Sequence, residues 1–299
     1  MHLDDAAIQK LELQANAIRQ SIIQMLLAAG SGHTAGSLGM ADIFTALYFH
    51  ILRHDPKQPD WPARDRVILS NGHICPVLYA TMAHAGYFPI EELQTLRKLG
   101  SRLQGHPHRE FLPMLETSSG PLGEGLSQAV GMAIADRMNA AVERQKVGDD
   151  QSIVTPHFFF CLTGDGELDE GNNWEAVMLA GREKLHNLIA IIDRNNIQID
   201  GYTENVLPLE NLRAKWEAFG WHVLEIDGHN FTEIVAAVDQ AKAIFEKPSV
   251  IIAHTIPGKG VVEFEQKFEW HGKPPTAAEA AIALNELRTL QGRIRSEHQ

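Results

Sequence analysis

The sequence predicts an α/β fold in which helices cover both faces of a mostly parallel sheet. From residue 157 onward, short and almost continuously apolar segments alternate with segments of helical length. This alternation is typical of βαβ units, whose parallel strands are buried on both sides. The chain has 299 residues, of which 44% are hydrophobic, enough for one large core. We therefore expect residues 1–299 to form a single α/β domain with an N-terminal helical decoration.

The first half of the chain is predicted to be mainly helical. Apolar residues recur every three or four positions over about residues 5–29, and Gly30 follows as a stop signal. A second helical pattern covers residues 41–53, and we expect the glycine-rich stretch 30–39 to be a loop. The remaining elements of this half are a strand at 67–70 and helices at about 76–85 and 124–146.

The second half contains most of the predicted sheet. Strands are expected at residues 158–163, 188–195, 222–226 and 249–255, with helices between them at about 172–184, 212–219 and 231–245. A last helix is predicted from an apolar stripe made of Ala281, Leu284, Leu287 and Leu290. Ligands of open α/β sheets bind at the carboxyl ends of the strands. The loops that follow the strands are therefore the places to search for a site.

Charge and cysteine content exclude several functional classes. The chain carries 26 Lys and Arg against 38 Asp and Glu, a net charge of −12. A field of this sign repels nucleic acid and anionic membranes, so we expect neither as a partner. The two cysteines, Cys75 and Cys161, match no metal-ligand spacing and are expected to be reduced thiols. With no leader-like start and no membrane-spanning run, the sequence predicts a cytoplasmic protein.

Polar residues at two neighbouring strand ends predict a metal site. Asp165 stands between Gly164 and Gly166 after one strand, and Asn195 follows the next. Alone, Gly-Asp-Gly more often closes an ordinary turn. The carboxyl ends of parallel strands share one edge of a sheet, however, so Asn195 can lie near Asp165. A carboxylate and an amide oxygen, with positions left for diphosphate oxygens, suit Mg²⁺.

These residues resemble the thiamin diphosphate fingerprint, in which Asn-Asn follows Gly-Asp-Gly one strand later. Further motifs extend the resemblance to the transketolase family: Gly32-His33, LSNGH at 69–73, Gly105-His106-Pro107, GPLGEG at 120–125, GDGELDEG at 164–171, DRNNIQIDG at 193–201 and Trp270-His271-Gly272. The resemblance implies a thiamin diphosphate-binding fold and transfer of a two-carbon ketol unit from a ketose phosphate to an aldose phosphate.

Family chains are normally longer, and carry a pyrimidine-binding domain and a further C-terminal domain after the diphosphate-binding domain. This chain therefore resembles the N-terminal subunit of a split transketolase. The resemblance implies a partner chain with the two remaining domains, in a heterotetramer of two copies of each chain. A glutamate needed to activate the cofactor would lie on that partner, so we expect this chain to be inactive alone.

The resemblance also implies which residues hold the metal ion and the cofactor. Mg²⁺ or Ca²⁺ would be bound by Asp165, by the side chain of Asn195 and by the main-chain carbonyl of Ile197. The residues implied to contact or border thiamin diphosphate, in addition to Asp165 and Asn195, are His73, Gly120, Leu122, Gly164, Gly166 and Glu170. Glu170 would also reach toward a glutamate of the partner and so link the two active sites.

Three histidines are the implied proton-transfer set, namely His33, His106 and His271. Imidazole suits this work because its pKa lies near neutrality and either nitrogen can donate. Other residues near the motifs are left open: His108, His229 and Lys259 could be functional or structural, and Pro-Gly-Lys-Gly at 257–260 is best interpreted as a turn. Glu167 and Asp169 are expected to face solvent or the partner chain.

Two alternative functions use the same metal ligands. An alpha-type subunit of a 2-oxoacid dehydrogenase also pairs a Gly-Asp-Gly chain with a second chain. The histidine-bearing motifs favour the transketolase over this alternative. A non-catalytic scaffold that binds thiamin diphosphate would keep the ligands but meet no complementary chain.

Overall fold

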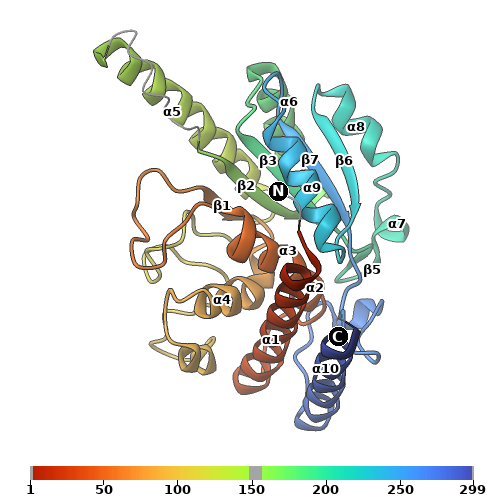
Figure 1. Ribbon diagram of the computed structural model, residues 1–299. Coiled ribbons are helices and arrows are strands. Elements are labelled where there is room, and N and C mark those ends of the chain that lie inside the picture. Colours follow the sequence, from red (N-terminus) through yellow and green to blue (C-terminus); the bar gives the residue numbers. More distant parts are fainter. Residues whose placement is uncertain (1–2, 148–156, 298–299) are drawn as a thin grey trace.

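A parallel sheet forms the centre of the computed structural model, which describes residues 3–147 and 157–297 (Figure 1). Within these residues the sheet has five strands in the order β1-β2-β3-β7-β6. Their bounds are β1 Arg66–Leu69, β2 Phe159–Gly164, β3 Leu188–Arg194, β6 His222–Asp227 and β7 Ser249–His254. All four strand pairings are parallel. The predicted α/β class and the predicted strands are confirmed.

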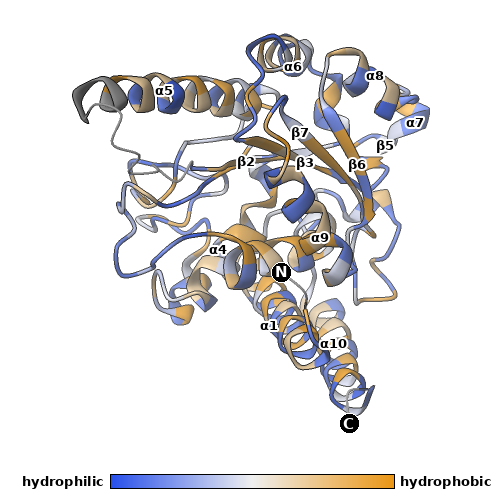
Figure 2. Ribbon diagram, turned by 45° about the horizontal axis from the view of Figure 1, so that its top comes forward, coloured by the Kyte–Doolittle hydropathy of each residue, from blue (hydrophilic) through white to orange (hydrophobic). Residues whose placement is uncertain are grey.

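Alternate side chains of the central strands enter two different cores. Phe160 and Leu162 of β2 join a core with the N-terminal helices, whereas Phe159 and Cys161 join a second core on the other face. Every residue of β3 is buried, as expected for a strand with both faces covered. Figure 2 shows the resulting hydrophobic strands between helices of mixed polarity.

Helices of the N-terminal half cover the first face of the sheet together with α9. They are α1 Asp5–Ala29, α2 Ala35–Gly39, α3 Ala41–Ala46 and α4 Cys75–His84, and α9 spans Phe231–Lys242. The second face is covered by α5 Glu124–Val147, α6 Gly171–Glu183 and α8 Leu212–Ala218. The N-terminal helices are thus part of the main core.

The first helix begins and ends where its sequence predicts. The side chain of Asp4 accepts a hydrogen bond from the N–H of Ala7 at 2.8 Å, which caps the start of α1. Gly30 closes the helix with φ of 64°, and its N–H bonds to the carbonyl of Leu26. Glycine adopts this left-handed conformation without a Cβ clash.

The glycine-rich stretch after α1 is only partly the loop that we expected. Its second half forms α2, because small buried residues let this helix pack tightly against its neighbours. A Cβ on Gly36 would lie 2.8 Å from Ile74, and one on Gly39 would lie 3.0 Å from the carbonyl of Ile256. The helical pattern predicted for 41–53 is also shorter, since α3 continues only through a π-helical turn at Leu47–Ile51.

The C-terminal helix α10 (Ala277–Glu297) packs against α1, and both extend below the sheet in Figure 1. Its buried residues are Ala280, Ala283, Leu287 and Ile294. Of the predicted apolar stripe, Leu287 is buried and Ala281 is exposed, so the buried face is rotated from the one expected.

Several short elements complete the described part of the chain. A hairpin of β4 (Ile197–Gln198) and β5 (Gly201–Tyr202) follows β3 and leads into α7 (Thr203–Val206). Short 3₁₀ helices occupy Gly72–Ile74, Ile90–Thr95, Gly166–Asp169 and Phe268–Trp270. Both cysteines are buried and free. Across residues 3–147 and 157–297, no helix has the length and apolar character needed to cross a membrane.

Candidate active site

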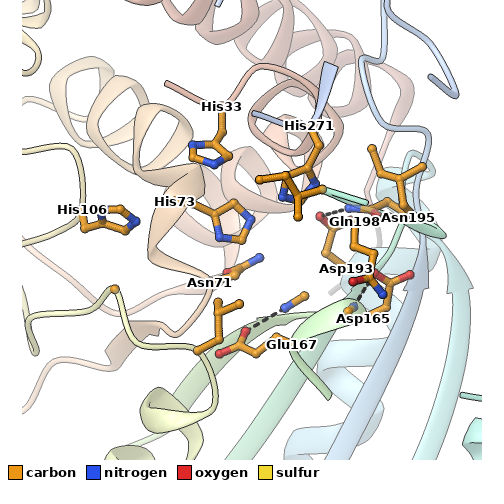
Figure 3. A pocket seen from close by; sticks show the side chains of 16 residues that line it. His33, Asn71, His73, His106, Asp165, Glu167, Asp193, Asn195, Gln198 and His271 are labelled. Atoms are coloured by element: carbon orange, nitrogen blue, oxygen red, sulfur yellow. Dashed lines mark hydrogen bonds between the residues drawn. The ribbon is translucent and has the colours of Figure 1, made fainter. Parts of the chain in front are cut away.

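A cavity of about 260 Å³ lies at the carboxyl ends of β1, β2 and β3, where the sequence predicted a site (Figure 3). Asn71 and His73 come from the turn after β1, and residues 164–167 come from the last residue of β2 and the turn after it. The segment after β3 contributes Asn195, Ile197, Gln198 and Ile199. The register pairs Gly164 with Asp193, so the last two turns begin side by side.

The cavity gathers nearly all the predicted site residues. Those that line it are His33, His73, His106, Gly120, Leu122, Gly164, Asp165, Gly166, Asn195, Ile197 and His271. Glu170 is the exception: it does not line the cavity, and it lies exposed at the start of α6, next to Gly123. Segments far apart in sequence therefore converge on one site, and Glu170 lies at its margin.

Three imidazole rings form a cluster on one side of the cavity. The ring centres of His33 and His73 are 4.9 Å apart, those of His73 and His271 are 5.1 Å apart, and those of His33 and His271 are 5.6 Å apart. Burial lowers the pKa of His33 to about 4, and the neighbouring His271 and Arg97 add to this effect. Burial also lowers the pKa of His73 well below its usual range, and it lowers the pKa of His271. The cluster is therefore neutral at pH 7, and each ring can both donate and accept.

His106 lies apart from this cluster, to the left of His73 in Figure 3. Burial and then the charge of Arg97 lower its pKa. Two side chains of α4 donate hydrogen bonds to the loop that carries His106. The thiol of Cys75 donates to the carbonyl of Gly105 at 3.2 Å, and the hydroxyl of Tyr79 donates to the carbonyl of Gln104 at 3.0 Å. The position of His106 thus depends on two buried side chains of α4.

Asp165 is a buried carboxylate in the cavity wall. Its Oδ1 accepts from the N–H of Gly166 at 2.8 Å, and its Oδ2 accepts from the N–H of Asn196 at 2.7 Å and from Nη1 of Arg194 at 3.1 Å. Burial raises its pKa to about 6, although Arg194 and these N–H groups act in the opposite direction. A nearby cation would favour the charged form.

Asp193 is a second buried acid that sequence reasoning did not single out. It accepts from Nδ2 of Asn195 at 2.8 Å and from the hydroxyl of Thr255. Burial raises its pKa to about 7. The available signal was a carboxylate at the end of an otherwise apolar strand. Gln198 and Ile199 also line the cavity without having been predicted, and Ile199 is exposed.

The donor set fits a hard cation with phosphate oxygens as further ligands. Asp165, Asn195 and Ile197 all line the cavity and offer carboxylate, amide and main-chain oxygens. Among the residues the structure describes, no group of three or more His, Cys, Asp or Glu could hold a metal by itself. Mg²⁺ commonly keeps few protein ligands and takes the rest from phosphates and water. The oxygen set therefore suits Mg²⁺ better than a transition metal.

Two polar atoms in the cavity wall also fit an organic ligand. Nδ1 of His33 and Oδ1 of Asn71 are buried and have no hydrogen-bond partner within the described residues. Buried polar atoms are nearly always bonded, so such exceptions require an explanation. A bound ligand with polar groups would satisfy both, and the glycine backbone at 164 and 166 leaves room for its close approach.

The expectation for Glu167 is wrong. It was expected to face solvent or a partner, but only 2% of it is exposed. Its Oε1 accepts from the hydroxyl of Ser70 at 2.5 Å and from the N–H of Gly123 at 2.8 Å, and its Oε2 accepts from the N–H of Gly164 at 3.0 Å. Burial raises its pKa, although these hydrogen bonds lower it. Asp169 is half-buried and is 3.4 Å from Nε2 of Gln198.

The residues left open by the sequence lie outside the cavity lining. His108 packs its ring against Phe111, with 4.6 Å between ring centres. His229 donates from Nδ1 to Asp42 at 2.7 Å and accepts from the N–H of Ile256 at Nε2. Lys259 lies in a turn, as its neighbouring glycines indicated. His229 is therefore held by hydrogen bonds within the fold, and none of the three residues contributes to the cavity wall.

Comparison with known proteins identifies the family. The protein-family model described as "Transketolase, thiamine diphosphate binding domain" matches residues 11–290 of this chain. This chain belongs to the transketolase family. The resemblance that the motifs indicated is thereby confirmed.

Relatives within the transketolase family include both short and long chains. The chain is 45% identical to a subunit of the 6-deoxy-6-sulfo-D-fructose transketolase of Clostridium sp. strain MSTE9, covering 93% of this chain and 96% of the relative. It is 39% identical to a subunit of the apulose-4-phosphate transketolase of Phocaeicola vulgatus, covering 97% and 98%. Both relatives are transketolase subunits of almost the same extent as this chain.

Other relatives, among them one with a solved structure, are longer than this chain. The transketolase of Leishmania mexicana superposes with a TM-score of 0.85 at 32% identity, covering 96% of this chain and 45% of that one. Transketolase 2 of Escherichia coli is 42% identical over 91% of this chain and 40% of its own length. The chain thus spans less than half the length of these relatives, and its fold is that of their thiamin diphosphate-binding part.

Proposed function

We propose that this chain is the thiamin diphosphate-binding subunit of a split transketolase that transfers a two-carbon ketol unit from a ketose phosphate to an aldose phosphate. The observation that carries the proposal is the cavity, which unites the Gly-Asp-Gly turn, the Asn195 turn and four motif histidines at one sheet edge. The near full-length match to two transketolase subunits supports it. It also favours ketol transfer over the 2-oxoacid dehydrogenase alternative.

Thiamin diphosphate would be held at both ends of the cavity. Gly164, Gly166 and His73 border the diphosphate end, with Asp165, Asn195 and Ile197 as ligands of Mg²⁺ or Ca²⁺. Gly120 and Leu122 lie where backbone groups would meet the aminopyrimidine. When bound, the cofactor supplies the carbanion-stabilising chemistry of ketol transfer.

The histidines would bind the sugar and move its protons. The pKa of His33, of His106 and of His271 is lowered, so at neutral pH each ring has one nitrogen that accepts a proton and one that donates. A neutral imidazole in hydrogen-bond reach of a sugar hydroxyl can take its proton and return it later. Nδ1 of His33 is available for this contact, because it has no hydrogen-bond partner among the residues that the structure describes.

A partner chain would complete the site. We propose that it carries the pyrimidine-binding domain and the further C-terminal domain, and that two copies of each chain form a heterotetramer. The cavity of about 260 Å³ is just below the roughly 300–1,000 Å³ of small-molecule pockets, which suits one half of a shared site. Glu170 is exposed at the cavity margin and would reach toward the partner. Free buried cysteines are compatible with a cytoplasmic complex.

Native mass spectrometry tests this proposal. The chain is captured from its own cell lysate in buffer with magnesium and thiamin diphosphate, and the complex is assayed with ketose and aldose phosphates. We expect a second transketolase chain in the complex and ketol transfer only with both chains present. A chain that binds the cofactor but appears alone or as its own dimer would support the scaffold alternative. Turnover of a 2-oxoacid instead would support the dehydrogenase alternative.

A further inference from the structure

Glu167 connects three loops that line the cavity but has no assigned role in the proposed function. Its carboxylate receives hydrogen bonds from Ser70 after β1, from Gly123 before α5 and from Gly164 after β2. Ser70 extends the connection, because its hydroxyl oxygen also accepts from the N–H of Gly125 at 3.0 Å. One carboxylate thus ties together the ends of two strands and the start of a helix.

The connected residues are immediate neighbours of the proposed cofactor contacts. Gly123 directly follows Leu122 at the pyrimidine end of the cavity, and Gly164 directly precedes Asp165 at the diphosphate end. Figure 3 shows the carboxylate of Glu167 below Asn71, with its hydrogen bond at the floor of the cavity. The Glu167 side chain therefore links the position of the pyrimidine end of the cavity to that of the diphosphate end.

Only a group that accepts every hydrogen bond suits this position. Glu167 is buried, and among the described residues it forms no ion pair with Lys or Arg. Burying such a charge is costly, so its retention needs a compensating set of donors. Glutamine has an N–H₂ group in place of one carboxylate oxygen. In one orientation this group would face the N–H of Gly164, and in the other it would face the N–H of Gly123. One of these donors would therefore always lose its acceptor.

Tight packing prevents the loops from compensating for a lost bond. A Cβ on Gly125 would lie 2.5 Å from the Cβ of Ser70, so this helix start already touches the end of β1. Asn173 of α6 also donates to the main-chain carbonyl of Glu167 at 2.6 Å, which fixes the backbone that carries the carboxylate. The Glu167 carboxylate therefore connects the start of α5 with a turn whose backbone is itself fixed by a hydrogen bond.

We propose that Glu167 is a positioning residue that sets the pyrimidine-side loop, residues 119–125, at the correct separation from the diphosphate-side turn, residues 164–166. The inference rests on the proposed function for the identity of the ligand that spans both. It assigns Glu167 no contact with the reacting atoms.

The test compares two ligands of different length on the complex of this chain with its partner. Calorimetry measures the affinity of thiamin diphosphate, which spans both loops, and of inorganic pyrophosphate, which reaches only the turn, each with Mg²⁺. For Glu167→Gln we expect thiamin diphosphate affinity to fall by about tenfold or more and pyrophosphate affinity by less than about threefold, the scale of one lost buried hydrogen bond. The exposed Glu246→Gln is the matched control and should change neither.

Hydrogen exchange supplies a readout that needs no cofactor. In Glu167→Gln the amides of segments 119–125 and 163–167 should exchange faster, while α9 and β7 keep their protection. Ser70→Ala removes the hydroxyl link and keeps the carboxylate, so it should give a smaller change in the same two segments. If Glu167→Gln fails to fold, the same exchange measurement is made on Ser70→Ala.

Each outcome separates this inference from the proposed function. Equal losses for both ligands, unchanged thiamin diphosphate affinity, or faster exchange in only one of the two segments would overturn the positioning role. If the wild-type complex binds no thiamin diphosphate, the proposed function fails instead. The exchange comparison between wild type and variant still decides whether Glu167 couples the two loops.

Discussion

Two buried acids in this protein have opposite surroundings. Asp42 of α3 faces Arg19 of α1, whose Nη1 and Nη2 donate to its two oxygens at 3.0 and 2.6 Å. His229 adds a third hydrogen bond at 2.7 Å. Asp165 faces the cavity and receives one guanidinium contact from Arg194, at 3.1 Å. Each carboxylate accepts three hydrogen bonds, but Asp42 has Arg19 to itself, whereas Asp165 lines the cavity and shares Arg194 with two other acids.

The pKa values follow from how the arginines are shared. Burial alone would raise the pKa of Asp42, but the charge of Arg19 and the hydrogen bonds from His229 and Arg19 lower it to about 2. Arg194 divides its charge among Asp165, Glu204 and Glu210, so the pKa of Asp165 rises to about 6 through burial. A dedicated partner stabilises the charge at the first site. An additional positive charge at the second site would favour its charged form.

The histidines of the two regions differ in the same way. The Nε2 of His229 accepts from the N–H of Ile256, so its hydrogen lies on Nδ1 and points to Asp42. Both nitrogens have a partner within the chain. In the cavity, Nδ1 of His33 has no partner among the described residues. Complete pairing thus marks a structural cluster, and incomplete pairing around a cavity marks a site for a ligand.

Breaking the paired cluster should have the largest effect on stability. Asp42→Asn leaves Arg19 buried without a counter-charge, so we expect the free energy of unfolding to fall by about 3–5 kcal/mol. Urea denaturation measures it. The exposed pair of Lys267 and Glu263 provides the control, because Glu263→Gln should cost less than about 1 kcal/mol. An equally small effect of Asp42→Asn would contradict the distinction between the two acids.

Removing the cavity acid should instead affect ligand binding. Asp165→Asn keeps the side-chain volume and removes the charge, so we expect magnesium-dependent affinity for thiamin diphosphate to fall by more than about 100-fold, beyond the loss typical of changes around a metal ligand. Calorimetry on the complex measures it, with the exposed Asp200→Asn as control. If affinity were unchanged, Asp165 could not be the metal ligand.

His106→Ala tests the catalytic half of the cavity. We expect cofactor affinity near that of wild type and ketol transfer lowered by about 100-fold or more, the scale of a lost proton-transfer group. His108 lies two positions further along the same loop and outside the cavity, so His108→Ala should retain wild-type turnover. Normal turnover in His106→Ala would remove His106 from the catalytic set.

The smallest expected effect is a pH dependence that separates the two regions. Unfolded histidine binds a proton near pH 6.5, whereas the pKa of His33 in the fold is about 4. Between these values the unfolded state holds more protons, so His33 makes stability fall as the pH falls from 6.5 to 4. The full difference in pKa would correspond to roughly 3 kcal/mol, but the His33 ring is only half-buried and solvent screens its charge. We therefore expect His33→Gln to reduce this loss by about 1–2 kcal/mol.

Urea denaturation without metal or cofactor at several pH values measures the difference between wild type and His33→Gln. The comparison with wild type is needed because other groups also change the stability with pH. Asp165, whose pKa is raised by the fold, binds protons on folding and therefore makes stability rise as the pH falls. Asp42 contributes in a separate window, since its stabilisation is complete above pH 3.8 and is lost as the pH falls through about 2. Identical pH profiles for wild type and His33→Gln would show that the His33 ring is not held neutral by the fold.

The α/β class, the main strands and the gathering of eleven predicted residues in one cavity could be predicted from the sequence. The class and the strands depend on local signals, namely apolar periodicity and glycines that end strands. The nearness of Asp165 and Asn195 follows from parallel strands that finish at one edge of the sheet. The other site residues, such as His33 and His106, were implied by the resemblance to transketolase motifs. Such patterns lie within short stretches of chain and need no knowledge of distant neighbours.

The tertiary structure alone decided which acids are buried and what they contact. Glu167 stands in an acidic run that suggests exposure, yet its three donors come from residues up to 97 positions away. Asp193 lies near the end of an apolar strand, and only the fold shows that it accepts hydrogen bonds from Asn195 and from Thr255. The helix at Ala35–Gly39 likewise depends on close packing against Ile74 and Ile256. Burial and hydrogen-bond partners arise from long-range packing, which no local pattern in the sequence encodes.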